Sequence, residues 1–225
     1  MFVLIPPSEG KAGDEKPSKQ CLAPALVKDS KGVLAHLKGL SPAEQQKFYG
    51  VKQTDKAALV HAMNLKSAKA PAIPAIERYT GVVYQHLDFQ SLRQKAYARK
   101  KLLFISAYFG LIPAGEAIPN YKLPINTWLV KYWRDLNSAR LEALAKGKPV
   151  LNLLSQSYAK AVQYEHLITV DFRVAGGKKS AGHFGKAIKG KFLRYLMENK
   201  VSRVDDFDGF REDGYRWDGS NFVQQ

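Results

Sequence analysis

The sequence predicts an α/β protein, in which a central mixed, partly parallel sheet is wrapped by helices. Two observations support this fold class. From residue 101 onward, short apolar runs alternate with stretches of helical periodicity, which is the order of βαβ units. Between residues 22 and 100, apolar residues recur instead at steps of three and four, as in successive helices. We therefore expect a single domain over residues 1–225, with residues 22–100 as a helical insertion within it.

Four apolar runs are the expected strands. The first, residues 2–5, is stopped by two prolines. Residues 102–108 form an unbroken apolar run, which is typical of a strand buried on both faces. Residues 149–154 and the β-branched run 166–172 follow later in the chain. These strands are expected to supply the central sheet.

Helical periodicity marks most of the remaining chain. Three helices of the insertion are expected at residues 54–64, 76–87 and 89–101, with a linker at 66–74. A Pro-rich crossing at 112–123 precedes a long helix, which begins at Asn126 or Thr127 and ends at Gly147. Six residues of that helix are expected to face inward: Trp128, Leu129, Tyr132, Trp133, Leu136 and Leu144. Residues 205–225 are expected as a tail.

Residues 31–49 predict two helices joined by a tight turn. Gly39 is expected to end the first helix in the C′ position. The second helix begins with Ser41 as N-cap, Pro42 in the first turn and Glu44 closing a capping box.

This pair of helices is similar to the helix-hairpin-helix module of DNA-binding proteins. There, a glycine lets backbone N–H groups approach a phosphate, and Gly39 with Lys38 would make that contact here. An ordinary αα-hairpin is the alternative.

The charge of the chain is its most unusual bulk property. Lys and Arg number 35 against 20 Asp and Glu, which gives a net charge of +15 at pH 7. Such a positive field attracts polyanions and releases their counterions on binding. Nucleic acid is the commonest partner of this kind, and an acidic membrane or a phosphorylated small molecule is the competing interpretation.

Part of this charge lies on a predicted helix within residues 178–200. The apolar residues of this stretch form one stripe: Phe184, Ile188, Phe192, Tyr195 and Leu196. The opposite side carries Lys179, Lys186 and Lys189, with His183 and Arg194 on its flank and Glu198 as the only acid. We interpret it as a helix that faces an anion. A plain amphipathic helix that is rich in lysine is the alternative.

Polar residues follow two of the predicted strands directly. Ser8, Glu9 and Lys11 come after the first strand, and Asn152, Ser155 and Lys160 come after the strand at 149–154. The crossing at 112–123 is expected to bring Glu116, Tyr121 and Lys122 to the same edge. Ligands of open α/β sheets bind outside the carboxyl ends of the strands, so these residues form a candidate site. Short polar loops of this kind are otherwise ordinary turns.

Several function classes are disfavoured by what the sequence lacks. The single cysteine, Cys21, excludes a disulfide framework within the chain and suits a reducing compartment. No signal peptide is recognised, and no apolar run reaches the roughly 18 residues of a membrane span. The five histidines show no metal-ligand spacing, and Gly177-Lys178 is not followed by the Ser or Thr of a P-loop. We therefore expect a soluble, intracellular protein without metal or cofactor. The sequence does not determine the oligomeric state, and a monomer is the expectation.

Five segments in register resemble the YaaA family, also called DUF328 or UPF0246, the peroxide stress resistance proteins. The segments are Ser8 to Lys11 (S-x-x-K), Pro74 to Tyr84 (P-A-I-E-x-Y-T-G-x-V-Y), Ser106 with Gly110, Leu111, Glu116 and Tyr121 to Leu123, Asn152 to Val162 (N-L-x-S-x-x-Y-x-K-A-V), and Lys186 to Tyr195. Together they cover nearly the whole chain. The sequence departs from the family pattern at Pro113-Ala114, where Arg-Pro is usual, and at Lys122 and Lys189, where arginine is usual. A lysine keeps the charge but loses bidentate geometry.

The resemblance implies a cytoplasmic bacterial protein that supports survival of hydrogen peroxide by limiting free iron and DNA damage. It also implies DNA binding through a basic cleft that includes a helix-hairpin-helix-like motif.

The first functional hypothesis is a non-enzymatic DNA-binding protein that selects bent, branched or damaged duplex rather than sequence. Phosphate contacts would supply most of its affinity. The candidate anion-binding residues are Ser8, Lys11, Lys38, Gly39, Lys122, Asn152, Ser155, Lys160, Lys179, Lys186, Lys189 and Arg194.

The second hypothesis is an enzyme acting on a nucleotide or a damaged nucleobase in a cleft lined by Lys and Glu. A lysine crowded by cations has a lowered pKa and can act as a base or as an imine-forming nucleophile. Lys11 and Lys186 are the candidate amines, and Glu9 and Glu116 the candidate acids. Direct sequestration of iron or haem is a third, weaker hypothesis.

Overall fold

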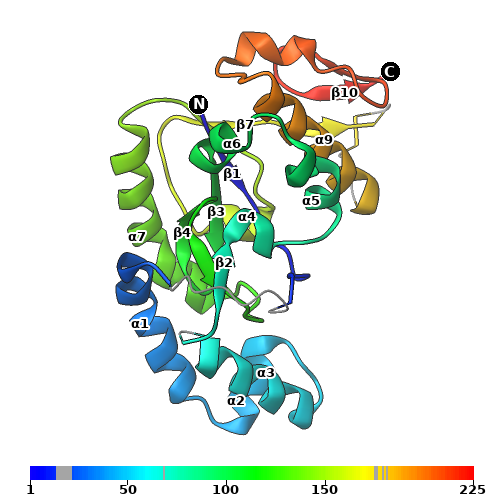
Figure 1. Ribbon diagram of the computed structural model, residues 1–225. Coiled ribbons are helices and arrows are strands. Elements are labelled where there is room, and N and C mark those ends of the chain that lie inside the picture. The colour runs from blue at the N-terminus through cyan, green and yellow to red at the C-terminus, as the bar shows by residue number, and fades with distance from the viewer. Residues whose placement is uncertain (14–21, 68, 175–176, 179, 181) are drawn as a thin grey trace.

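The computed structural model describes residues 1–13, 22–67, 69–174, 177–178, 180 and 182–225. Within these residues a five-stranded sheet has the order β4-β3-β1-β6-β7 (Figure 1). Strands β1 (Phe2–Ile5), β3 (Leu102–Ser106), β6 (Val150–Asn152) and β7 (Leu167–Thr169) are parallel, and β4 (Gly110–Pro113) pairs with β3 in the antiparallel sense. The α/β class and the mixed, partly parallel sheet are confirmed.

The register brings the carboxyl ends of the central strands level with one another. Ile5 lies opposite Phe104 of β3, and Leu4 lies opposite Asn152 of β6. All five residues of β3 are buried, as an apolar run without alternation predicts for a strand covered on both faces.

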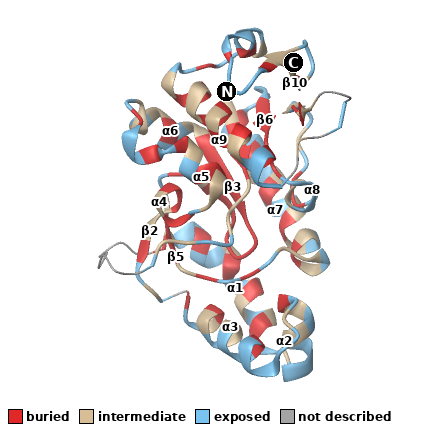
Figure 2. Cartoon of the chain, turned by 90° about the vertical axis from the view of Figure 1, so that its right-hand side faces the viewer, coloured by how far each residue is buried: buried red, intermediate tan, exposed pale blue. Residues whose placement is uncertain are grey.

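Helices cover both faces of the sheet (Figures 1 and 2). Helix α7 (Thr127–Ala145) packs on one face, where the indole of Trp133 donates a hydrogen bond to the carbonyl of Ala107 at 2.9 Å. Helices α5 (Val82–Leu87) and α9 (Gly182–Glu198) pack against each other on the other face. Asn126 is the N-cap of α7, as expected. Leu136 and Leu144, expected inward, are partly exposed because they lie on the outer edge of this helix.

Residues 22–100 are mostly helical. Helices α1 (Pro24–Lys38), α2 (Pro42–Tyr49) and α3 (Thr54–Ser67) gather at one end of the molecule (Figure 1). The fully buried Asn64 attaches α3 to the sheet region, since its side chain bonds both the N–H and the carbonyl of Lys122. The short strand β2 (Ala72–Pro74) also falls in this range and pairs with β5 (Ala117–Pro119).

The prediction of a single helix over residues 76–87 is wrong. The structure has two short helices, α4 (Ala75–Arg78) and α5, separated by an extended segment. Tyr79 in this segment forms a β-bridge with Lys11, and Gly81 has φ of +122°, which helical backbone does not allow. The helix expected over 89–101 likewise divides into a 3-10 turn (Phe89–Ser91) and α6 (Lys95–Lys101).

The capping box at Ser41 and Glu44 is confirmed at the start of α2. A helix-hairpin-helix motif is not shown. Gly39 has φ of −85° rather than a left-handed conformation, and its N–H donates to His36 within the turn. The Glu44 carboxylate accepts from the Ser41 N–H at 2.8 Å, so a negative group already occupies the N-terminus of α2.

The chain after β7 builds a second small sheet. Strands β8 (Phe172–Arg173), β10 (Phe222–Gln224) and β9 (Tyr215–Trp217) lie in that order, so the expected tail is folded rather than extended. The rings of Phe172 and Phe222 stack at 5.1 Å and pack on Phe192 of α9. No helix in the described ranges is long and apolar enough to cross a membrane.

Gly110 offers a test of the packing between α7 and β4. It has φ of +68°, and a Cβ there would lie 2.6 Å from the Trp133 ring and 2.7 Å from the Asn137 side chain. Gly147 has φ of +73° but nothing within 4 Å of such a Cβ. We expect Gly110→Ala to lower the free energy of unfolding by about 2 kcal/mol more than Gly147→Ala, because only the first adds a clash to the backbone strain. Urea unfolding of both variants measures the difference, and equal losses would contradict this description of the core.

Candidate functional site

The topology of the sheet points to one site, at the carboxyl ends of β1 and β6, which we call the crevice. The chain leaves β1 toward β3 on one side and leaves β6 toward β7 on the other, so the connections diverge between β1 and β6. Ligands of open α/β sheets bind at such a point, outside the carboxyl ends of the two strands. Here these ends continue into residues 6–11 and residues 153–158. A backbone hydrogen bond connects the two strand ends, because the Leu153 N–H donates to the carbonyl of Leu4 at 2.9 Å.

The loop after β1 holds Lys11 in a fixed position. Its Nζ donates to the carbonyl of Ser8 at 3.0 Å and to that of Glu9 at 3.4 Å. The loop runs beside the segment between α4 and α5, where the Thr80 N–H donates to Gly10 at 3.0 Å. A Cβ at Gly10 would lie 2.9 Å from the Thr80 hydroxyl, so this approach favours glycine. Two distant segments therefore set the place of the Lys11 amine.

The Arg78 side chain holds this loop in place. Its guanidinium is fully buried and donates to backbone carbonyls of three segments. The distances are 2.6 Å to Ala12, 3.2 Å to Pro71 and 3.3 Å to Ile118. Hydrogen bonds from a charged donor contribute about 1.5–3 kcal/mol each, which offsets the desolvation of the guanidinium.

Aromatic rings form the floor beneath the amine. The Nζ of Lys11 lies 4.3 Å from the ring centroid of Tyr121 and 5.6 Å from that of Tyr79. The two phenol oxygens are 2.8 Å apart, and Tyr121 is also 2.8 Å from the hydroxyl of Ser106 at the end of β3.

The Ser106 hydroxyl accepts the N–H groups of Tyr108 and Phe109, which use both of its lone pairs. Its own proton is thus directed to Tyr121, and that of Tyr121 to Tyr79. This chain of hydrogen bonds locks the rings face-on to Lys11.

Burial changes the ionisation of these groups. Desolvation is the largest cause that lowers the pKa of Lys11, to about 8; the positive charges of Arg78 and Lys122 lower it further, and the negative charge of Glu9 opposes them. An appreciable fraction of Lys11 is therefore neutral near pH 8. Desolvation raises the pKa of the Tyr121 phenol, which stays protonated at neutral pH. Glu9 and Lys122 thus lie within electrostatic range of the Lys11 amine.

The other side of the crevice is formed by β6 and α9. The Asn152 amide donates to the Thr169 hydroxyl at 3.2 Å, and its oxygen accepts the Leu154 N–H at 3.0 Å, so this side chain shapes the end of β6. Lys189 of α9 reaches the Leu153 carbonyl at 3.5 Å. Lys186 is exposed and lies one turn earlier on the same side of α9. Burial, followed by the charges of Tyr121 and Glu9, raises the pKa of Tyr158, which places this residue at the crevice too.

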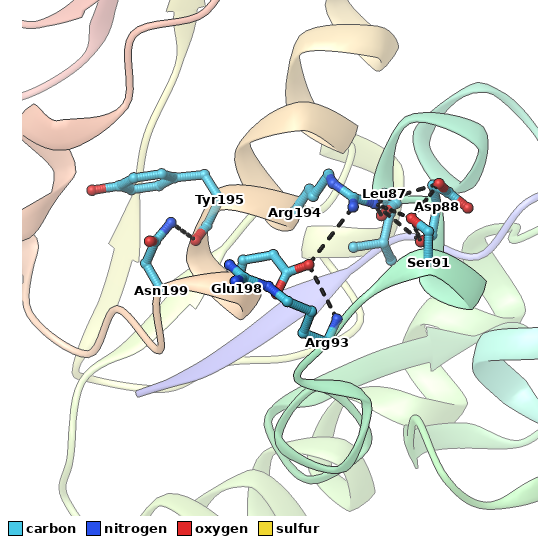
Figure 3. A network of polar contacts seen from close by, with 8 residues as sticks. All are labelled: Leu87, Asp88, Ser91, Arg93, Arg194, Tyr195, Glu198 and Asn199. Carbon is cyan, nitrogen blue, oxygen red and sulfur yellow. Dashed lines mark hydrogen bonds and ion pairs between the residues drawn. The ribbon is translucent and has the colours of Figure 1, made fainter.

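Arg194 belongs to the network of Figure 3, at the C-terminal end of α5. Its guanidinium donates to the Leu87 carbonyl at 3.1 Å and to the Ser91 hydroxyl at 2.8 Å, and it forms ion pairs with Asp88 and Glu198. It therefore caps the end of α5. An open groove of about 590 Å³ beside this network is lined by the C-terminal half of α9, and not by Lys11 or the strand ends.

Four other predicted residues also lie apart from the crevice. Glu116 precedes β5 and accepts the Ala75 N–H, at the opposite end of α4 from Tyr79. Lys160 follows α8 (Gln156–Ala159) and is held toward α7, where Arg134 donates to its carbonyl at 3.1 Å. Lys38 and Gly39 belong to the α1–α2 hairpin. Ser155 is exposed and its hydroxyl lies 3.2 Å from that of Ser157, beside the crevice. Lys179 lies outside the described residues.

Sequence reasoning missed Arg78 and Asn64 as site-building residues. Arg78 stands in a segment whose periodicity predicts a continuous helix, and nothing in that pattern marks the arginine as buried. Asn64 ends the helix predicted over residues 54–64, yet in the structure its side chain holds Lys122 beside the crevice. Among the described residues, no group of three or more His, Cys, Asp or Glu side chains is placed to hold a metal ion.

The chain is similar to known proteins over nearly its whole length. A family model described as "Peroxide stress protein YaaA" matches residues 1–221. A UPF0246 protein of Alteromonas mediterranea is 32% identical, with 96% of this chain and 92% of the relative covered. UPF0246 proteins of Corynebacterium glutamicum and Streptomyces coelicolor are 33% and 34% identical; the first covers 91% of this chain and 88% of the relative, the second 88% and 83%.

Two substitutions should move the pKa of Lys11 in opposite directions. Glu9→Gln removes a negative charge that raises this pKa, so we expect it to fall below about 8. Lys122→Gln removes a positive charge that lowers it, so we expect it to rise. NMR titration of the 13C-methylated lysines, with Lys11→Arg to assign the signal, measures both shifts. Shifts of the same sign, or none, would show that these side chains do not surround the amine.

Proposed function

The chain belongs to the family of the peroxide stress protein YaaA, and on that premise we propose that it is a cytoplasmic DNA-binding protein of the oxidative stress response. It would select bent, branched or damaged duplex rather than sequence, and it would limit DNA damage and free iron under peroxide. The observation that carries this proposal is the net charge of +15 combined with lysines at one crevice. The DNA-binding part of the proposal rests on the charge and on the resemblance.

The lysines of the crevice support a phosphate-binding role. Lys122 stands at its β1 side, and Lys186 and Lys189 stand on α9 at its β6 side. A duplex or a distorted strand lying across the sheet edge would meet cations from both sides. Such contacts act on the backbone of DNA and give little sequence preference.

We also propose that the α1–α2 hairpin contributes to DNA binding. The N–H groups of Gly39 and Leu40 donate within the turn, and Glu44 occupies the start of α2. A phosphate would therefore meet the exposed side chain of Lys38 rather than the hairpin backbone.

A second candidate function, catalysis on a nucleotide or a damaged base, is favoured by Lys11. A binding surface needs an exposed ammonium, whereas this amine is largely desolvated and lies within electrostatic range of Glu9.

Binding to duplex DNA should weaken as salt rises from about 50 to about 200 mM, and two variants should reduce that dependence. We expect Lys122→Ala and Lys186→Ala to weaken binding several-fold and to lower the salt slope by about 1 each, because each loses a phosphate contact.

Lys100→Ala is the matched control. It removes the same charge from α6, which precedes β3 and so lies toward the amino edge of the sheet. Gel-shift titrations of all four proteins on intact and branched duplexes test the proposal. It would be refuted by salt-independent affinity, or by an equal loss in Lys100→Ala.

A further inference from the structure

We propose that Lys11 is an amine nucleophile that forms an imine with an aldehyde sugar, and that the substrate class is the ring-opened deoxyribose of an abasic site in DNA. The geometry that supports this is an amine fixed over two phenol rings at the point where the sheet connections diverge. The inference deepens the proposed function, because it rests on DNA as the partner.

The position of Lys11 differs from that of a phosphate-binding lysine. Its Nζ is held by the Ser8 carbonyl at 3.0 Å and by the face of Tyr121 at 4.3 Å, so its side chain is not free to follow a phosphate. By contrast, Lys122 and Lys186 are exposed. A fixed and desolvated primary amine is what imine chemistry requires, because the neutral amine is the nucleophile. The lowered pKa of Lys11 supplies that neutral fraction near pH 8.

The groups around the amine suit each intermediate. The neutral amine attacks the C1′ carbonyl carbon; a C–N bond forms, and the carbonyl oxygen takes up a proton. Loss of water from this carbinolamine gives the iminium ion. The charge of Glu9 acts on Lys11, and we assign to this carboxylate the proton transfers of these steps. The face of Tyr121, which now contacts the ammonium, would stabilise the iminium cation in the same way.

The iminium ion makes strand cleavage possible without an added oxidant or reductant. It acidifies the C2′ proton, which a base removes. The electron pair moves to form the C2′–C3′ double bond, and the C3′–O bond breaks with release of the 3′ phosphate. Water then hydrolyses the imine and regenerates the Lys11 amine.

The surroundings also fit a sugar that carries phosphates and lacks a base. Lys122 acts electrostatically on Lys11 and is exposed, so it can contact a phosphate that flanks the bound sugar. The buried rings of Tyr79 and Tyr121 close the floor below the amine. The aldehyde carbon of the sugar would therefore approach the Lys11 amine from the side opposite these rings.

Trapping with sodium cyanoborohydride tests this inference on the full chain. An end-labelled duplex with one abasic site is incubated with the protein and the reductant, which converts the imine to a stable amine. We expect a covalent protein–DNA adduct whose yield rises from about pH 6.5 to about pH 8, and peptide mapping should locate it at Lys11. Lys11→Arg keeps the charge but cannot form an imine, so this substitution should lower the yield of the adduct at least about ten-fold.

Lys100→Arg is the matched control and should retain the adduct, because Lys100 lies on α6, toward the amino edge of the sheet. An adduct mapped to other lysines, or one that persists in Lys11→Arg, would overturn the inference. Mapping on the unsubstituted protein gives this answer even if Lys11→Arg does not fold.

Two further measurements separate this inference from the proposed function. Binding to intact duplex with no trapped adduct would overturn the imine role and leave DNA binding standing. Trapping of 2-deoxyribose 5-phosphate at Lys11 without any duplex binding would support the imine role and overturn the DNA proposal.

Discussion

The buried guanidinium of Arg78 is the constraint on which the candidate site depends. It joins the loop after β1 to the segments around β2 and β5 through backbone carbonyls, one of them 66 residues away in the chain. A buried cation is tolerated only where its donors are satisfied, so each of those segments must keep its place. With the loop fixed, Lys11 has one position, over the rings that Ser106 aligns. Fold and site are therefore connected through a residue that touches no solvent.

The cations of the chain differ in their surroundings: some form ion pairs with acidic side chains, and others lie exposed. On α9, Arg194 and Lys191 are engaged with Asp88, Glu198, Glu212 and Asp213. At the other end of that helix, Lys186 is exposed and Lys189 turns toward β6. Acidic residues thus compensate the cations in the half of α9 that packs on the C-terminal segments. Net charge alone does not reveal this division, because it sums both kinds of cation.

The crevice combines features that DNA binding and catalysis use differently. Exposed lysines at its rims suit the backbone of a polyanion, and they need no fixed geometry. The amine over the tyrosine floor is the opposite case, since its position is fixed and its charge is destabilised by burial. Both proposals place the chain in peroxide stress, which is the setting of its family. Under these proposals, oxidised DNA would offer a damaged backbone and reactive sugars in one ligand.

The sequence by itself determined the fold class, the four apolar strands, the capping box at Ser41 and the net charge, because each of these depends on neighbours along the chain. The tertiary structure alone decided that Lys11 and Lys122 meet at one crevice while Arg194 caps α5. It also decided that the predicted helix breaks at Tyr79, where a bridge to Lys11 outweighs local helix propensity. Periodicity reports which face of an element is apolar. It does not report which distant loop that element will meet, because those contacts are set by packing across the whole sheet.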